Sequence, residues 1–92
     1  MPQQDMTAHL NQAFSNVNDV LKNAGSKGWD DVFLIRAYFS RLHEDGLSEA
    51  WPEVAKQWLP NHRPVLTAYQ VGALWVSEMR VEIEVEALVD SK

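Results

Sequence analysis

The most constraining feature of this sequence is a regular alternation of apolar and charged residues over residues 80–89. Only an extended chain sends successive side chains to opposite faces, so this segment is predicted to be a strand. One face is apolar and can enter a core, while the other carries the carboxylates of Glu82, Glu84 and Glu86. A second strand is predicted just before it, within residues 64–74. The C-terminal third therefore indicates a sheet with one face buried.

A helix is predicted near the N-terminus, over residues 7–24. Its apolar residues recur at the three-and-four spacing of one helical stripe. These residues are Leu10, Ala13, Phe14, Val17, Val20, Leu21 and Ala24. Gly25 follows and can adopt the positive φ that often ends a helix.

Residues 32–39 form the next element, a run rich in β-forming residues and apolar on both sides. Such a run is typical of a central strand that is buried on both faces. We expect Phe33, Ile35 and Phe39 to lie beneath Phe14 of the first helix.

A second helix is predicted over residues 48–59, with Trp51 and Trp58 on its buried stripe. Ser48 is the expected N-cap, and Pro52 would be tolerated in the first turn, where a missing N–H has few intrahelical partners. The order helix, strand, helix, strand, strand predicts an α+β fold over a single domain, 1–92. In this fold both helices pack on one face of a mixed sheet.

The composition narrows the classes of partner. Eight Lys and Arg against thirteen Asp and Glu give a net charge of −5, which disfavours nucleic acid. The absence of cysteine excludes disulfides and fits a reducing compartment, so we expect a cytoplasmic protein or one of the mitochondrial matrix. The longest apolar run is far shorter than the roughly 20 residues that span a bilayer, and no signal peptide is visible, so no membrane partner is expected.

Few residues suggest a cofactor or a hydrolytic triad. His9, His43 and His62 are too scattered for a metal site, and the four glycines stand singly, so neither a metal nor another cofactor is predicted. Ser40 and Thr67 have no evident histidine partner in the sequence.

Two groups of residues could bind or react with a ligand. One of the glutamates at 82, 84 and 86 could be a general base, although their spacing alone favours a solvated sheet face. His62 and Arg63 could bind an anion, with a surface ion pair as the alternative role for Arg63.

The two C-terminal segments resemble the signature of the YjgF/Rid family, also called the endoribonuclease L-PSP family. In that signature a Pro-x-Arg strand is followed by a Val-Glu-Ile-Glu strand, and residues 12–25 and 58–64 are also similar to family segments. The resemblance implies a chorismate-mutase-like α+β fold, a homotrimer and small-molecule sites between subunits. It also implies further strands before Met1, so we expect a chain shortened at its N-terminus, with an open sheet edge.

The same resemblance assigns possible site positions. Leu66 stands where the imine-hydrolysing branch has the arginine that binds the substrate carboxylate. Thr67 and Ala68 match positions whose backbone lines the site, and Glu82 matches the glutamate that positions the attacking water.

The leading hypothesis is an oligomeric protein that binds a small metabolite between subunits, because an aliphatic Leu66 cannot replace a bidentate guanidinium. The alternatives are an enamine/imine deaminase, a non-catalytic assembly module, and an L-PSP-type endoribonuclease or translation inhibitor. The last is disfavoured by the net charge.

Overall fold

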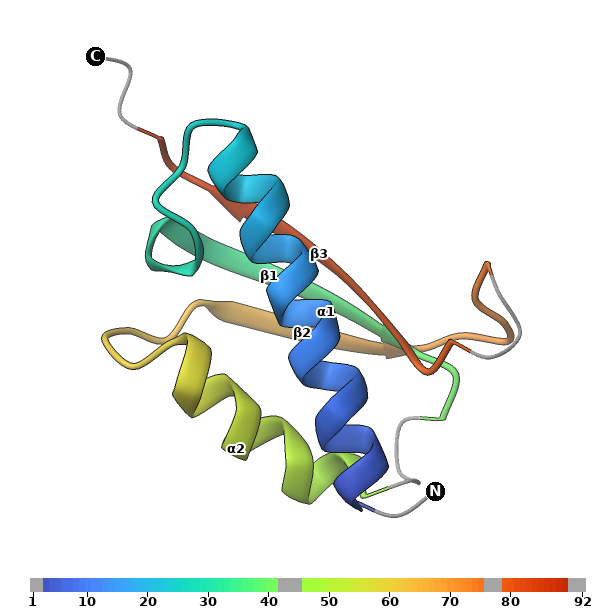
Figure 1. Cartoon of the computed structure of the whole chain (residues 1–92). Coiled ribbons are helices and arrows are strands. Elements are labelled where there is room, and N and C mark those ends of the chain that lie inside the picture. The colour runs from blue at the N-terminus through green and yellow to red at the C-terminus, as the bar shows by residue number, and fades with distance from the viewer. Residues whose placement is uncertain (1–2, 42–45, 76–78, 90–92) are drawn as a thin grey trace.

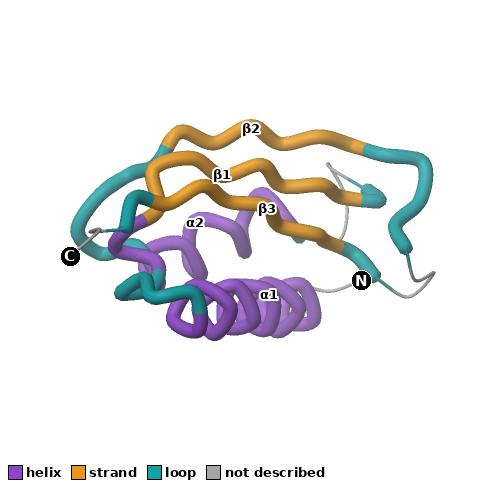
Figure 2. Tube along the Cα trace, turned by 90° about the horizontal axis from the view of Figure 1, so that it is seen from above, coloured by secondary structure: helices purple, strands orange, loops and turns teal. Residues whose placement is uncertain are grey.

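The computed structural model describes residues 3–41, 46–75 and 79–89. Its elements follow the predicted order, with a short 3₁₀ helix added between the first helix and the first strand. They are α1 (Gln3–Asn23), η1 (Trp29–Asp31), β1 (Val32–Phe39), α2 (Leu47–Trp58), β2 (Val65–Gln70) and β3 (Val81–Ala87). Both helices lie on one face of the sheet (Figures 1 and 2). The predicted α+β fold is confirmed.

The three strands form a mixed sheet in the order β2-β1-β3. β1 and β2 are parallel and are joined through α2, whereas β1 and β3 are antiparallel. The predicted central position of β1 is therefore confirmed. Its second face is not covered by any element that the structure describes, as the edge-on view shows (Figure 2), so the prediction that β1 is buried on both faces is wrong for this chain.

The core lies between the helices and the covered sheet face. Phe14 of α1 is at its centre, fully buried, with ring centroids 4.5 Å from Trp29, 5.3 Å from Trp51 and 6.4 Å from Trp58. The indole N–H of Trp29 donates to the Phe14 carbonyl over 2.8 Å. Ile35 and Phe39 of β1 close the core from the sheet side, as predicted.

Several residues of the predicted apolar stripes are exposed, among them Ala24 and Val89, which lie beyond the ends of α1 and β3. Val20 of α1 is 67% exposed, because at about 100° per residue it lies roughly 120° around the helix from Phe14. Phe33 is 44% exposed because the β1–β3 register shifts between Val32 and Leu34. This bulge breaks the period of two and leaves Phe33 out of the core face.

The start of α2 also differs from the prediction. Gly46, with φ 74°, precedes the first helical residue, and no side chain caps it. The Ser48 hydroxyl instead donates to the Glu49 carboxylate over 2.9 Å, so the predicted N-cap is wrong. Pro52 is the sixth residue of the helix, beyond the first turn, and cannot donate a helical hydrogen bond to the Ser48 carbonyl.

The turn between α1 and β1 is held by one carboxylate. Asp31 accepts from the Lys27 N–H over 2.8 Å and from the Ser26 hydroxyl over 2.9 Å. The Lys27 N–H and then the Ser26 hydroxyl lower the pKa of Asp31 below its usual value. The turn contains two glycines with positive φ, Gly25 at 95° and Gly28 at 104°.

The two glycines predict a matched pair of stability effects. Gly28→Ala should lower the free energy of unfolding by about 1–3 kcal/mol, because its φ of 104° and ψ of −147° suit only glycine and a Cβ would contact the Asn18 amide of α1. Gly25→Ala should cost less, since a Cβ there has open space and adds only backbone strain. Urea unfolding of both variants measures the difference, and equal losses would contradict this explanation.

Candidate functional site

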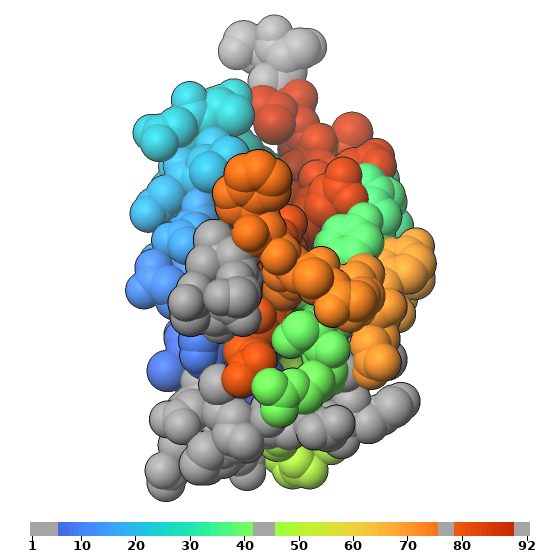
Figure 3. All heavy atoms as spheres, turned by 90° about the vertical axis from the view of Figure 1, so that its right-hand side faces the viewer, coloured from blue at the N-terminus to red at the C-terminus, as the bar shows by residue number. Residues whose placement is uncertain are grey.

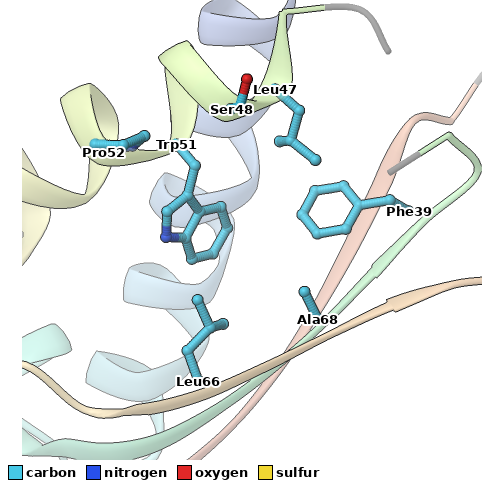
Figure 4. Close-up of a pocket in the computed structure, with 7 residues that line it drawn as sticks. All are labelled: Phe39, Leu47, Ser48, Trp51, Pro52, Leu66 and Ala68. Atoms are coloured by element: carbon cyan, nitrogen blue, oxygen red, sulfur yellow. The ribbon is translucent and has the colours of Figure 1, made fainter. Parts of the chain in front are cut away.

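A pocket of about 320 Å³ opens between α2 and β2 (Figure 4). α2 contributes one wall, β2 the opposite wall, and the end of β1 the floor between them. Its lining residues are Phe39, Leu47, Ser48, Trp51, Pro52, Leu66 and Ala68. We call this cavity the α2–β2 pocket.

Strand alternation decides which residues of β2 reach this pocket. Leu66 and Ala68 pair with Ile35 and Ala37 of β1, whose side chains are buried under the helices. Both therefore lie on the helix side and line the pocket, and Leu66 remains 43% exposed. Thr67 lies between them and its side chain takes the opposite face of the sheet.

His62 and Arg63 do not line the α2–β2 pocket. His62 Nε2 lies within hydrogen-bond distance of the Val32 carbonyl, at 2.7 Å. This contact connects the segment after α2 to the start of β1. Arg63 Nη1 donates to the carbonyls of Leu59, over 3.0 Å, and of His62, over 3.2 Å. Arg63 thus caps the carboxyl end of α2, and it forms no ion pair with any residue that the structure describes. Binding of an anion by these two residues stays a prediction.

The second face of the sheet, which we call the open face, carries alternating residues of all three strands. It comprises Leu34, Arg36 and Tyr38 of β1, Val65, Thr67 and Tyr69 of β2, and Glu82, Glu84 and Glu86 of β3.

A network of charged and aromatic side chains crosses the open face. Arg36 donates to Glu84 over 2.9 Å and to Glu86 over 3.0 Å. Tyr38 donates to the same Glu84 oxygen over 2.9 Å and stacks on Tyr69 with centroids 5.2 Å apart. The predicted glutamate face is therefore a cross-strand network, in which two of the three carboxylates bind one guanidinium.

These hydrogen bonds shift the pKa values of Glu84, Tyr38 and Arg36. The hydrogen bond from Arg36, and then that from Tyr38, lowers the pKa of Glu84. The bond to Glu84 raises the pKa of Tyr38, and the bonds to Glu84 and Glu86 raise the pKa of Arg36. Because the folded pKa of Glu84 is depressed, its contribution to stability is present at neutral pH and is lost as the pH falls through that pKa.

Removing the guanidinium should raise the pKa of Glu84. In Arg36→Gln the largest cause of the depression is gone, so the pKa should move up towards the ordinary glutamate value. Tyr38→Phe removes only the second cause and should give a smaller rise. A pH titration followed by carboxyl-carbon NMR checks both variants, and an unchanged value in Arg36→Gln would contradict the assignment.

Glu82 differs from its two neighbours on β3. It pairs with Tyr38 across the open face, and within the described part of the chain its carboxylate makes no hydrogen bond or ion pair. It lines a shallow hollow with Tyr38, Leu74 and Trp75, where Trp75 is 93% exposed. Figure 3 views the molecule from this end, with the orange segment after β2 on the surface beside the green end of β1.

The chain does not bring the two main predicted site positions together. Leu66 lies on the helix side of β2, whereas Glu82 lies on the open face of β3, with β1 between the two strands. A site that used both would need Glu82 from a second copy. Phe39 and Trp51 line the pocket but were not predicted as site residues. The sequence indicated only that both side chains are buried.

Other sites are not evident in the residues that the structure describes. No group of three potential metal ligands occurs over 3–41, 46–75 and 79–89. Over the same ranges, no helix combines the length and apolar character needed to cross a bilayer.

Comparison with known proteins gives consistent matches. The family model described as Endoribonuclease L-PSP matches residues 1–89. YyfB from Yersinia pestis, described as a Rid-family protein of unknown function, is 26% identical with a TM-score of 0.79, over 94% of this chain and 64% of that one. Rv2704 from Mycobacterium tuberculosis, described as a member of the YjgF/YER057c/UK114 family, is 29% identical with a TM-score of 0.74, over 86% of this chain and 64% of that one.

A more distant structure shows the fold alone. Yeast Mmf1 is 19% identical with a TM-score of 0.72, over 84% of this chain and 58% of that one. The chain thus spans less than two thirds of the length of each of these three structures. No curated protein matches it.

Proposed function

Because the chain belongs to the endoribonuclease L-PSP family, also called the YjgF/Rid family, we propose that it self-associates and binds a small metabolite in the α2–β2 pocket. One observation carries this proposal. The pocket contains Leu66 and Ala68, which the family resemblance assigns to the site strand, and it opens beside the outer strand of the sheet. A second copy placed along β2 would complete the walls of the pocket.

Self-association is supported by the exposure of β2. All six of its residues are exposed, and within the described ranges it pairs with β1 on one side only, in the order β2-β1-β3. The outer edge of such a strand presents backbone N–H and C=O groups that readily pair with another chain. Val65 on the open face is 64% exposed and adds apolar surface there. A homotrimer is the assembly that the family resemblance implies, and a solution mass above 10.5 kDa is the first requirement.

Binding without imine hydrolysis is the function that the pocket supports best. Among the residues that the structure describes, the lining of the α2–β2 pocket holds no Arg, Lys or His to receive a substrate carboxylate. An enamine/imine deaminase is the second candidate, because Glu82 keeps a carboxylate without a partner in the described residues and a second copy could bring it to the pocket. Ribonuclease activity is disfavoured by the net charge of −5 and by the carboxylates of the open face.

The unmodified chain should therefore give negligible acceleration of 2-iminobutanoate hydrolysis. Losing a bidentate charged contact removes several kcal/mol of transition-state binding, on the order of a thousandfold in rate. Ammonia release measured by a coupled assay tests this expectation. Turnover well above the buffer rate would contradict it and would favour the deaminase.

Leu66→Arg provides the matched variant for this assay. It places a guanidinium on the pocket side of β2, at the position of a side chain that is already partly exposed. If activity appears and is lost again in Leu66→Arg, Glu82→Gln, then Glu82 takes part and must come from another copy.

A further inference from the structure

The shape of the α2–β2 pocket favours a flat ring. The rings of Phe39 and Trp51 meet nearly edge to face, with centroids 6.1 Å apart and planes at 80°. Leu66 and Ala68 lie across from them on β2 (Figure 4). A volume of about 320 Å³ is at the small end of ligand pockets and suits a molecule with a single ring.

The side chains that line the pocket also favour an uncharged ligand. None of the seven lining residues is ionisable, and Ser48, the one hydroxyl, already donates to Glu49 outside the lining. In Figure 4 the Ser48 oxygen points away from Leu66 and Ala68. A carboxylate would therefore lose its hydration without gaining a cation, and an ammonium group would gain no carboxylate, so both are costly to bury here.

One lining residue, Trp51, has a side-chain N–H without a partner among the residues that the structure describes. The indole N–H groups of Trp29 and Trp58 donate to Phe14 and Asn11, whereas that of Trp51 has no partner among the described residues. The Trp51 nitrogen lies on the side of its ring away from Phe39 (Figure 4). An indole nitrogen donates only, so its natural partner on a ligand is a neutral acceptor such as a carbonyl oxygen.

We propose that the α2–β2 pocket is selective for an uncharged ligand with a single ring and one hydrogen-bond acceptor, and that it discriminates against carboxylates. The ring packs against Trp51 and Leu66, and the acceptor receives the indole N–H at the edge of Trp51 that faces away from Phe39. This inference rests on the proposed function, since it concerns the ligand class of the same pocket.

The test uses three probes of nearly equal size that differ in charge: benzamide, benzoate and benzylammonium. Each is titrated into the ¹⁵N-labelled protein at neutral pH, and the indole N–H signals are followed after assignment by single Trp→Phe variants. Benzamide should shift the Trp51 signal, leave the Trp29 and Trp58 signals in place, and bind at least about tenfold more tightly than either ion.

Three variants separate the contributions. Trp51→Phe keeps an aromatic ring but removes the donor, so benzamide should bind about three- to tenfold more weakly, as measured on the backbone amide signals of Leu66 and Ala68. The remaining indole signals report whether the fold is intact. Leu66→Arg should invert the preference and make benzoate the tighter ligand. Val20→Arg adds the same charge at an exposed position of α1 outside the lining, so it should leave the preference for benzamide unchanged.

The outcomes are distinguishable. If benzoate or benzylammonium binds the unmodified chain as tightly as benzamide at the Trp51 signal, the proposed selectivity is overturned while small-molecule binding in this pocket stands. If none of the probes shifts the Trp51 signal, both the selectivity and the use of this pocket are overturned. If Val20→Arg inverts the preference as Leu66→Arg does, the change in preference follows the net charge of the protein, and the lining does not select the ligand.

Discussion

Phe14→Ala should lower the free energy of unfolding by about 3–5 kcal/mol, a large share of the stability of a small protein. The side chain is fully buried, and its ring contacts aromatic rings of η1 and α2. Truncation leaves a cavity between both helices and the sheet, because the surrounding rings come from different elements and cannot all move inward together.

Val20→Ala is the matched control for this experiment. It truncates an apolar residue of the same helix, but Val20 is largely exposed, so its effect should stay within about 0.5 kcal/mol. Chemical denaturation of both variants gives the comparison. Equal stability losses would show that α1 does not present Phe14 to the core.

The fold could be predicted where apolar and polar residues alternate regularly over the whole length of a helix or strand. The alternation in β3 is confirmed, with Val81 buried and Glu82, Glu84 and Glu86 on the open face. Helix α1 is confirmed by the same kind of pattern, since Leu10 and Phe14 are fully buried. These patterns could be read from the sequence because side-chain direction in a regular element depends on position alone.

Local irregularities were not predictable from these patterns. The bulge beside Phe33 depends on how β1 pairs with β3, which the run of apolar residues does not reveal. The start of α2 was misplaced because Ser48 is a common N-cap residue, whereas Gly46 with its positive φ precedes the helix.

The candidate site was only partly predictable. Alternation along β2 correctly separates Leu66 and Ala68 from Thr67, because adjacent residues of a strand take opposite faces. The separation of Leu66 from Glu82 depends on the strand order, which places β1 between their strands, and this order is not encoded in any local pattern. The meeting of Trp51 with Phe39 likewise depends on how α2 crosses the sheet.

We propose that copies of this chain associate beside β2 and enclose the α2–β2 pocket between them. Multi-angle light scattering across a concentration series from about one to one hundred micromolar tests it most directly, because mass is obtained without a standard of assumed shape. A homotrimer should have a mass three times that of the 10.5 kDa chain, and the mass should fall only upon dilution. A mass of 10.5 kDa throughout the series would contradict it.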